Sequence, residues 1–188
     1  MYSIPAAINC LYIILLMFTK TDIEKYFIAE KQESLLFLII GIVAVILAIA
    51  FYFFMKASLY KGAALPLMLI GLIQIAVGFT VYKRSDDDRI RNVYSFDMNP
   101  GQMKQDELPR MEKVNRNFVV YRWVEIAFAA IGILLIIKMR GNESGTFWYG
   151  FGIALMIQAF IMLGADYFAE QRAHRYTYGI EAFLKEKT

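Results

Sequence analysis

The stretch SLLFLIIGIVAVILAIAFYFFM, Ser34 to Met55, decides the fold class, because it carries no charged side chain over its whole length. The hydrocarbon core of a bilayer is about 30 Å thick, and a helix needs about 20 consecutive apolar residues to cross it. Three more stretches reach this length with few polar residues, at 63–82, 118–137 and 147–167. The pattern predicts an all-α integral membrane protein whose four spans form a transmembrane helix bundle.

The composition agrees with this class and argues against others. Hydrophobic residues make up 59% of the chain and the mean hydropathy is +0.46, whereas soluble domains are about 45–50% apolar. The charged residues, 20% of the total, gather in blocks between the apolar runs. The net charge is only +3 and no basic, base-stacking face is evident, so we expect no nucleic-acid partner and a lipid bilayer as the surroundings.

Sequence motifs for catalysis and for cofactor or metal binding are missing. His174 is the only histidine and Cys10 the only cysteine, so neither a paired-histidine metal site nor a cysteine cluster can form within one chain. The acidic run in RSDDDRIR, residues 84–91, offers oxygen ligands for a hard cation, but its arginines indicate solvated charges at the exit of a span. We therefore expect no catalytic residue, no cofactor and no metal.

A fifth apolar stretch, at residues 3–18, is shorter than the other four. As a helix its 16 residues would reach about 24 Å, which is less than the thickness of the bilayer core. It also lacks the strongly polar face of an interfacial helix. Two alternatives stay open for it, a short fifth span and a re-entrant segment.

Lysine and arginine set the expected orientation. Sixteen of the 20 fall on one side of the four spans, and the positive-inside rule places that side in the cytoplasm. We thus expect a multi-pass protein of the cell inner membrane with a cytoplasmic C-terminus. The chain then divides into an N-terminal apolar segment with its cytoplasmic linker (1–33), a first transmembrane hairpin (34–82), a cytoplasmic charged loop (83–117), a second transmembrane hairpin (118–167) and an amphipathic cytoplasmic tail (168–188).

Part of the charged loop is expected to be helical. DMNPGQ, residues 97–102, is typical of a turn, and Pro109 suits the first turn of a helix, where its missing N–H costs nothing. Apolar residues then recur at helical spacing. We expect one long helix from about Leu108 to Lys138, which projects into the cytoplasm before it enters the bilayer.

Five polar or charged residues inside the apolar stretches form the candidate site. Arg122 and Glu125 lie three residues apart on one helix face, a spacing that favours a direct ion pair. All five fall in the expected cytoplasmic half of the spans, where a bundle would bring them together: Gln74, Arg122, Glu125, Gln158 and Asp166. Ionisable residues are costly in a membrane unless they are paired. The set predicts either a polar network that holds the helices together or an ion or small-molecule pathway, and a catalytic centre is the least favoured alternative.

A weak internal repeat relates the two hairpins. A shift of 84 residues aligns Gln74 with Gln158 and Lys56 with Arg140, as two parallel hairpin repeats would require. Small residues such as Gly41 recur in the spans and allow helices to approach closely. They fit packing within one chain and packing between copies equally well, so a homo-oligomer stays an alternative.

The function predicted first is non-enzymatic: a small bacterial-type inner-membrane protein that binds a protein partner in or beneath the bilayer through the long helix near Pro109. In topology the chain resembles immunity proteins against membrane-acting toxins and regulatory or defence membrane subunits, and this likeness implies action by protein interaction. The alternative is a small channel or transporter that uses the Glu/Asp/Gln cluster. A membrane-embedded enzyme is the second alternative.

Overall fold

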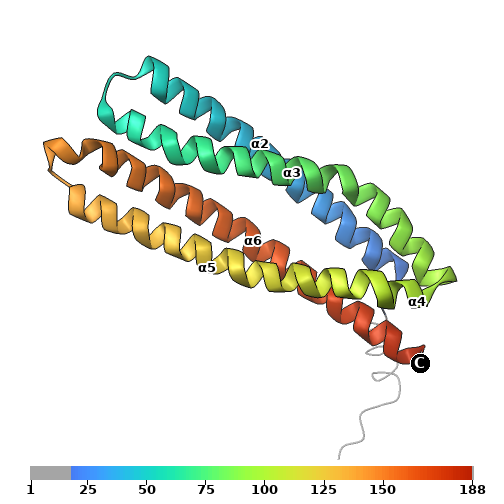
Figure 1. Ribbon diagram of the computed structural model, residues 1–188. Coiled ribbons are helices and arrows are strands. Elements are labelled where there is room, and N and C mark those ends of the chain that lie inside the picture. Colours follow the sequence, from blue (N-terminus) through green and yellow to red (C-terminus); the bar gives the residue numbers. More distant parts are fainter. Residues whose placement is uncertain (1–17, 188) are drawn as a thin grey trace, which may run out of the picture.

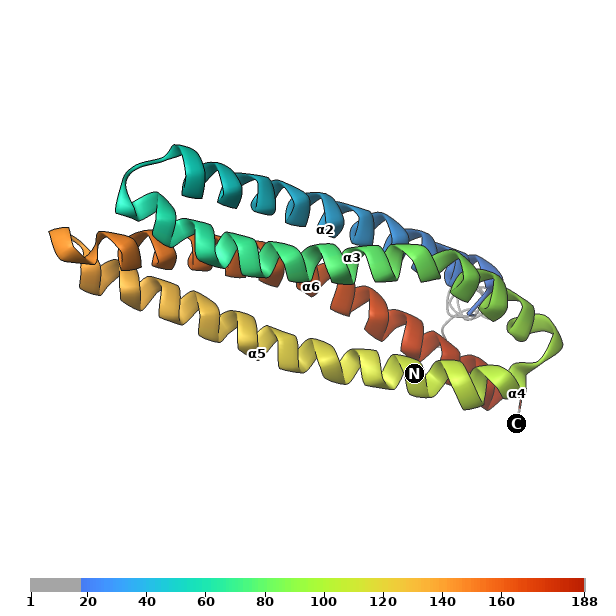
Figure 2. The same cartoon turned by 45° about the horizontal axis from the view of Figure 1, so that its top comes forward.

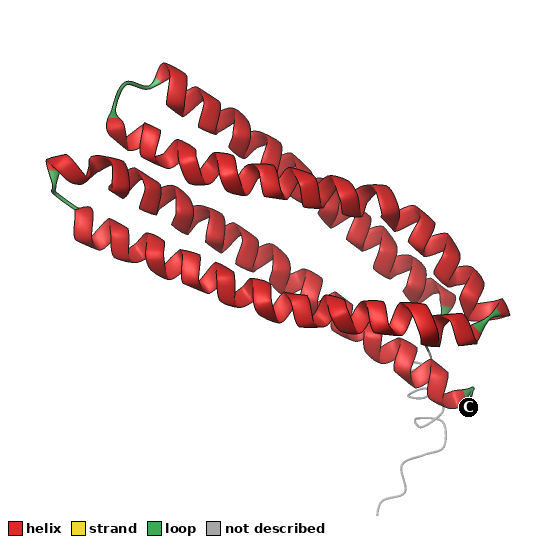
Figure 3. Cartoon of the chain, in the orientation of Figure 1, coloured by secondary structure: helices red, strands yellow, loops and turns green. Residues whose placement is uncertain are grey.

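The computed structural model describes residues 18–187, apart from the side chain of Glu143. Within this range the long elements are all helices and no strand occurs (Figure 3). The expected all-α fold is confirmed. The apolar stretch expected as a fifth or re-entrant segment, at residues 3–18, lies outside the described residues except for Phe18.

Four long helices carry the fold, and short helical elements connect them. The long helices are α2 (Lys20–Phe54), α3 (Ser58–Met98), α5 (Leu108–Met139) and α6 (Thr146–Glu186). The short elements are α4 (Pro100–Gln102), the π-helix η1 (Met103–Glu107) and the 3-10 helix η2 (Glu143–Gly145). Each long helix contains a stretch long and apolar enough to cross a membrane.

The molecule forms two helical hairpins that lie side by side (Figure 1). Residues 55–57 join α2 to α3, and residues 140–145 join α5 to α6, so both short connections lie at the same end of the bundle (Figures 1 and 2). Helices α3 and α6 run in the same direction and make the main contact between the hairpins. Each pair of consecutive long helices in a hairpin is therefore joined by a short connection.

The bundle has two halves that differ in surface and in core. The apolar half contains the connections at residues 55–57 and 140–145, and leucine and isoleucine side chains point outward from it; Ile46, Ile73 and Leu134 are each more than half exposed. The charged half contains most of the ion pairs. We define the apolar half as residues 34–82 and 118–167, and the charged half as residues 20–33, 83–117 and 168–186.

Glycines set the closest approaches in the apolar half. A Cβ atom at Gly62 would collide with the backbone carbonyl oxygen of Phe147, and one at Gly150 would collide with that of Leu59. The two hairpins thus exchange reciprocal contacts, although the residues that correspond in them, Gly62 with Gly150 and Leu59 with Phe147, do not follow the 84-residue shift of the internal repeat. Within the second hairpin, a Cβ at Gly132 would lie 2.8 Å from the carbonyl oxygen of Gly152, so these backbones pack as small residues allow.

Residues 83–117, expected as a charged loop, are helical almost throughout. Helix α3 continues past the apolar half to Met98, and the chain reverses at Asn99, whose side-chain oxygen accepts from the N–H of Gln102 at 3.3 Å. Helix α5 then begins at Leu108, with Pro109 in its first turn. The expected turn and the expected long helix are confirmed. The segment between the hairpins, in contrast, is not a loop but a helical part of the bundle.

The charged half has a hydrophobic core of its own. Val93 and Phe96 of α3 pack against this core, and its buried side chains come from α2, η1, α5 and α6: Ile23, Tyr26, Phe27, Met103, Met111, Ala173, Tyr176, Ile180 and Phe183. The rings of Tyr26 and Tyr176 stack with centroids 4.0 Å apart, and those of Phe96 and Phe183 stack at 4.3 Å. Because this core ties α2 and α6 to the segment 83–117, the charged half is a folded extension of the helices.

Candidate functional site

The two glutamines of the candidate site face one another in the centre of the bundle. Gln74 of α3 and Gln158 of α6 are both buried, and the Nε2 atom of Gln74 lies 3.5 Å from the Oε1 atom of Gln158. Their contact joins the two hairpins at equivalent points of the repeat. A polar pair buried among apolar side chains favours one register of the helices, because a shift would leave both amides unpaired.

Arg122 and Glu125 do not form the ion pair that their spacing favours. Arg122 instead pairs with Glu170 of α6, and the same carboxylate lies 3.4 Å from the Nε2 atom of His174. Glu125 is buried, and neither of its carboxylate oxygens has a hydrogen-bond donor among the described residues. The neighbouring helix, rather than local spacing along α5, thus decides the partner of Arg122.

Glu125 and Asp166 form a carboxyl pair between α5 and α6. The two carboxyl groups are close enough to interact across the helices, although no donor among the described residues reaches the carboxylate oxygens of Glu125. Two carboxylates this close repel one another unless one of them is protonated.

Further charges surround this pair where the apolar and charged halves meet. Arg172 of α6 pairs with Glu33 of α2 across the bundle. We call the whole set the boundary cluster: Glu33, Arg122, Glu125, Asp166, Glu170 and Arg172. The five predicted site residues fall into two separate groups. Gln74 contacts Gln158, whereas Arg122, Glu125 and Asp166 all belong to the boundary cluster.

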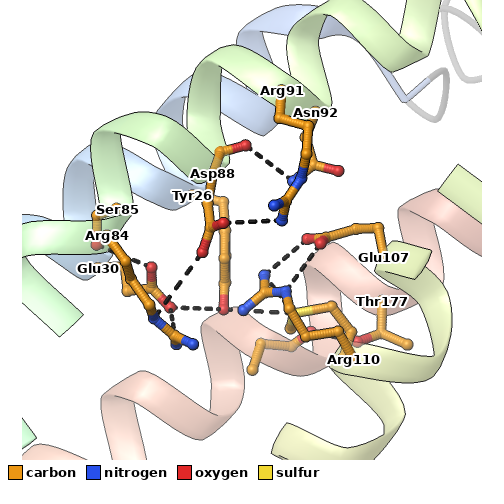
Figure 4. Close-up of polar contacts among 12 residues, drawn as sticks. Tyr26, Glu30, Arg84, Ser85, Asp88, Arg91, Asn92, Glu107, Arg110 and Thr177 are labelled. Carbon is orange, nitrogen blue, oxygen red and sulfur yellow. Dashed lines mark hydrogen bonds and ion pairs between the residues drawn. The ribbon is translucent and has the colours of Figure 1, made fainter. Parts of the chain in front are cut away.

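A second polar network lies within the charged half, and the sequence analysis did not identify it (Figure 4). Glu30 of α2 accepts hydrogen bonds from the hydroxyl of Ser85 at 3.0 Å and from that of Tyr26 at 3.4 Å. Arg84 lies 3.8 Å from Glu30 and 3.9 Å from Asp88. The carboxylate of Asp88 also accepts from Arg91 at 2.8 Å, so these charges connect α2 to α3.

The same network continues at the start of α5. Arg110 donates two hydrogen bonds to the buried carboxylate of Glu107, at 2.7 and 2.8 Å, and its guanidinium lies 5.6 Å from the ring centre of Phe27. Burial raises the pKa of the Tyr26 phenol far above its usual range, and the carboxylate of Glu30 adds to this shift. The Tyr26 hydroxyl is therefore un-ionised at physiological pH and acts as a hydrogen-bond donor.

Two of the three aspartates of RSDDDRIR, Asp86 and Asp88, have protein partners. Asp86 pairs with Lys31 of α2, and the hydrogen bond from that lysine lowers the pKa of the Asp86 carboxyl. Asp88 is buried among arginines, in contrast to the solvated position expected for it. Among the described residues no group of His, Cys, Asp and Glu side chains is placed to hold a metal ion.

Comparison with known proteins gives no relative from which to transfer a function. No protein-family model matches the chain, and neither a curated protein nor a solved structure matches it. The function is therefore inferred from the polar clusters and exposed surfaces alone.

Proposed function

We propose that the apolar half spans a membrane and that the charged half lies in the cytoplasm with the C-terminus. Four helices of sufficient length and apolar composition support this placement, as do the outward-facing leucines and isoleucines of the apolar half. Fifteen of the 20 lysines and arginines lie on the proposed cytoplasmic side, and Arg122 lies within a span close to it, in agreement with the positive-inside rule. The inner membrane of a bacterial-type cell fits this charge distribution.

The protein acts by binding another protein through its charged half. The observation that carries this proposal is an apolar stripe on α3, formed by Ile90, Tyr94 and Met98, which are 64%, 61% and 69% exposed. These residues follow one another at four-residue spacing and therefore lie on one face of the helix. They lie outside the proposed spans, where lipid would not cover them, and exposed apolar patches of this kind mark interaction sites.

This stripe moves the expected contact from α5 to α3. The exposed residues near the beginning of α5 are mostly polar or charged: Lys104, Gln105, Asp106, Pro109, Glu112 and Lys113. The end of α3 and the beginning of α5 both belong to the segment 83–117. The partner is therefore still expected to contact this segment, but through α3 instead of α5. A regulatory subunit or an immunity protein, which both act by holding another protein, would fit such a surface.

An ion or proton pathway is the second candidate function, and the carboxyl pair of Glu125 and Asp166 favours it. The rest of the apolar half argues against it. Between the glutamine pair and the connections at residues 55–57 and 140–145, the described buried residues are all glycine or apolar. A pathway needs polar groups along its length, so the interaction function ranks first.

Site-specific photo-crosslinking in cells tests the proposed interaction. A photo-reactive phenylalanine analogue replaces Tyr94 in the stripe, and a matched control replaces Lys113 on the exposed face of α5. We expect a discrete protein adduct from position 94 only, and its loss when Ile90 and Met98 are changed to aspartate. Equal adducts from both positions, or none from position 94, would contradict the proposal. Deletion of residues 83–117 is unsuitable, because it removes Met103 and Met111 from the core.

A further inference from the structure

Glu125 is a deeply buried carboxyl group without a hydrogen-bond partner. Its side chain is 1% exposed, and neither carboxylate oxygen has a donor among the described residues. Glu107, which is 2% exposed, accepts two hydrogen bonds from Arg110, so the two buried glutamates have opposite surroundings. A buried carboxylate is costly unless it is paired or loses its charge. Glu125 therefore needs a cation or a proton.

The register of α5 against α6 brings Asp166 to Glu125. Arg122 of α5 contacts Glu170 of α6, and the two helices run in opposite directions. Glu125 follows Arg122 by three residues, and Asp166 precedes Glu170 by four. Each step is about one helical turn, so both carboxyl groups lie at one level on facing sides of the helices. Their mutual influence agrees with this placement.

The basic side chains of the boundary cluster serve other carboxylates. Arg122 pairs with Glu170, and Arg172 pairs with Glu33. His174 lies 3.4 Å from the same Glu170 carboxylate and is exposed. Both arginines of the cluster are thus engaged, and neither is left to neutralise Glu125.

The other helices add no positive charge at this level. Helix α3 carries no charged residue between Lys61 and Lys83, and Lys83 is exposed. On α2, Glu33 lies near Asp166 and carries the same charge as it does. Two carboxyl groups supply too few of the roughly six or more oxygen ligands that Mg²⁺ and Ca²⁺ take, and among the described residues no set of His, Cys, Asp and Glu is placed to hold a metal ion. A proton needs only one oxygen from each group.

We propose that Glu125 and Asp166 share one proton at neutral pH, and that this proton holds α5 against α6 near the end of the apolar half. Two neighbouring carboxylates repel one another, so the second hairpin loosens at this level when the proton leaves. Asp166 is only half-buried, so the proton exchanges with solvent beside the charged half and needs no path across the apolar half. The inference goes beyond partner binding and does not depend on it, because it rests on contacts within one chain.

Infrared spectroscopy of the full chain in detergent tests the inference directly, because a protonated carboxyl group has a C=O band that a carboxylate lacks. We expect this band from the unchanged protein at neutral pH and its loss in Glu125→Gln. The amide of that glutamine can donate to Asp166, which then ionises. Glu112→Gln is the matched control, because it makes the same change on the exposed surface of α5, and it should keep the band.

The unfolding equilibrium, measured with a denaturant in detergent, gives a second test. A proton that only the folded protein holds is released on unfolding, so stability falls as the pH rises. From mildly acidic to neutral pH, the folding constant of the unchanged protein should fall by up to about tenfold per pH unit relative to that of Glu125→Gln. Glu112→Gln should follow the unchanged protein.

Any of four outcomes overturns the inference. Absence of the band from the unchanged protein at neutral pH would show that both carboxyl groups are ionised. A band that persists in Glu125→Gln would place the proton elsewhere. A band that appears only after sodium and potassium are replaced by a bulky organic cation would show that an alkali-metal ion neutralises the pair. Equal pH dependence of stability in the unchanged protein and Glu125→Gln would separate the proton from helix packing. The first and third outcomes need no variant, so they decide the matter even if Glu125→Gln does not fold.

Discussion

Replacing Glu107 by alanine should destabilise the charged half by about 3 kcal/mol, because it leaves a largely buried guanidinium without its partner. The carboxylate of Glu107 is 2% exposed and accepts both hydrogen bonds from Arg110, whose side chain is 19% exposed. Breaking a fully buried pair costs about 3–5 kcal/mol, and the partial exposure of Arg110 places the expected value at the lower end.

The double variant Glu107→Leu with Arg110→Met gives the reasoning its sharpest test. Replacing both partners by apolar side chains removes the unpaired charge, so it should cost less than the single change Glu107→Ala. Asp97→Asn is the matched control, because Asp97 and its partner Lys20 are 42% and 49% exposed, and exposed pairs contribute about 0–1 kcal/mol.

Thermal unfolding of the purified protein in detergent, followed by circular dichroism, measures all three variants. We expect the transition temperature to fall most for Glu107→Ala, less for the double variant and least for Asp97→Asn. If Glu107→Ala were as mild as Asp97→Asn, or the double variant were the worst of the three, the buried pair would not have the energetic role assigned to it.

Three further predictions concern other parts of the molecule. Gly62→Ala should lower the thermal transition, because its Cβ meets the backbone of Phe147, whereas Gly164→Ala, whose Cβ meets nothing within 4 Å, should raise it slightly through helix propensity. Gln74→Leu should cost about 1 kcal/mol in the same assay by leaving Gln158 unpaired, and the double change with Gln158→Leu should cost less; a larger loss in the double variant would contradict this. The hydrogen bond from Lys31 depresses the folded-state pKa of Asp86 below its usual value of 3.8, so the stability that this pair contributes is present above pH 3.8 and is lost as the pH falls through the folded-state pKa. The difference in stability between the unchanged protein and Asp86→Asn should therefore disappear in acid. A difference in stability that grows in acid would contradict the sign.

The apolar half could be predicted from the sequence because its signal is strong and local. Each long apolar run is sufficient to indicate a helix. The alignment of the two hairpins made Gln74 and Gln158 equivalent positions, but their contact was expected only as part of one cluster of five residues. The charged half was harder, because the buried face of α3 there consists of Ser85, Asp88, Asn92 and Ser95. Polar residues at helical spacing look like a solvated face in a sequence, so the sequence predicts a loop where α3 continues.

The partners of the candidate site residues also depend on contacts between helices, and local spacing along one helix does not predict them. Spacing along α5 favoured Glu125 as the partner of Arg122, but the register of α5 against α6 brings Glu170 to it. Likewise, Glu30 becomes part of a network only because α3 places Ser85 and Arg84 beside it. Such contacts depend on how helices are rotated against one another, which a single sequence does not specify.

Because α3 is continuous, its apolar part and the exposed stripe near its end are expected to move together as one body. The helix runs without interruption from Ser58 to Met98, so no hinge separates its apolar part from the stripe at Ile90, Tyr94 and Met98. Met98 lies 16 residues beyond Tyr82, roughly 24 Å along the axis. A tilt of about 10° at Tyr82 would therefore move Met98 sideways by roughly 4 Å, enough to translate a small change in span packing into a displaced contact surface.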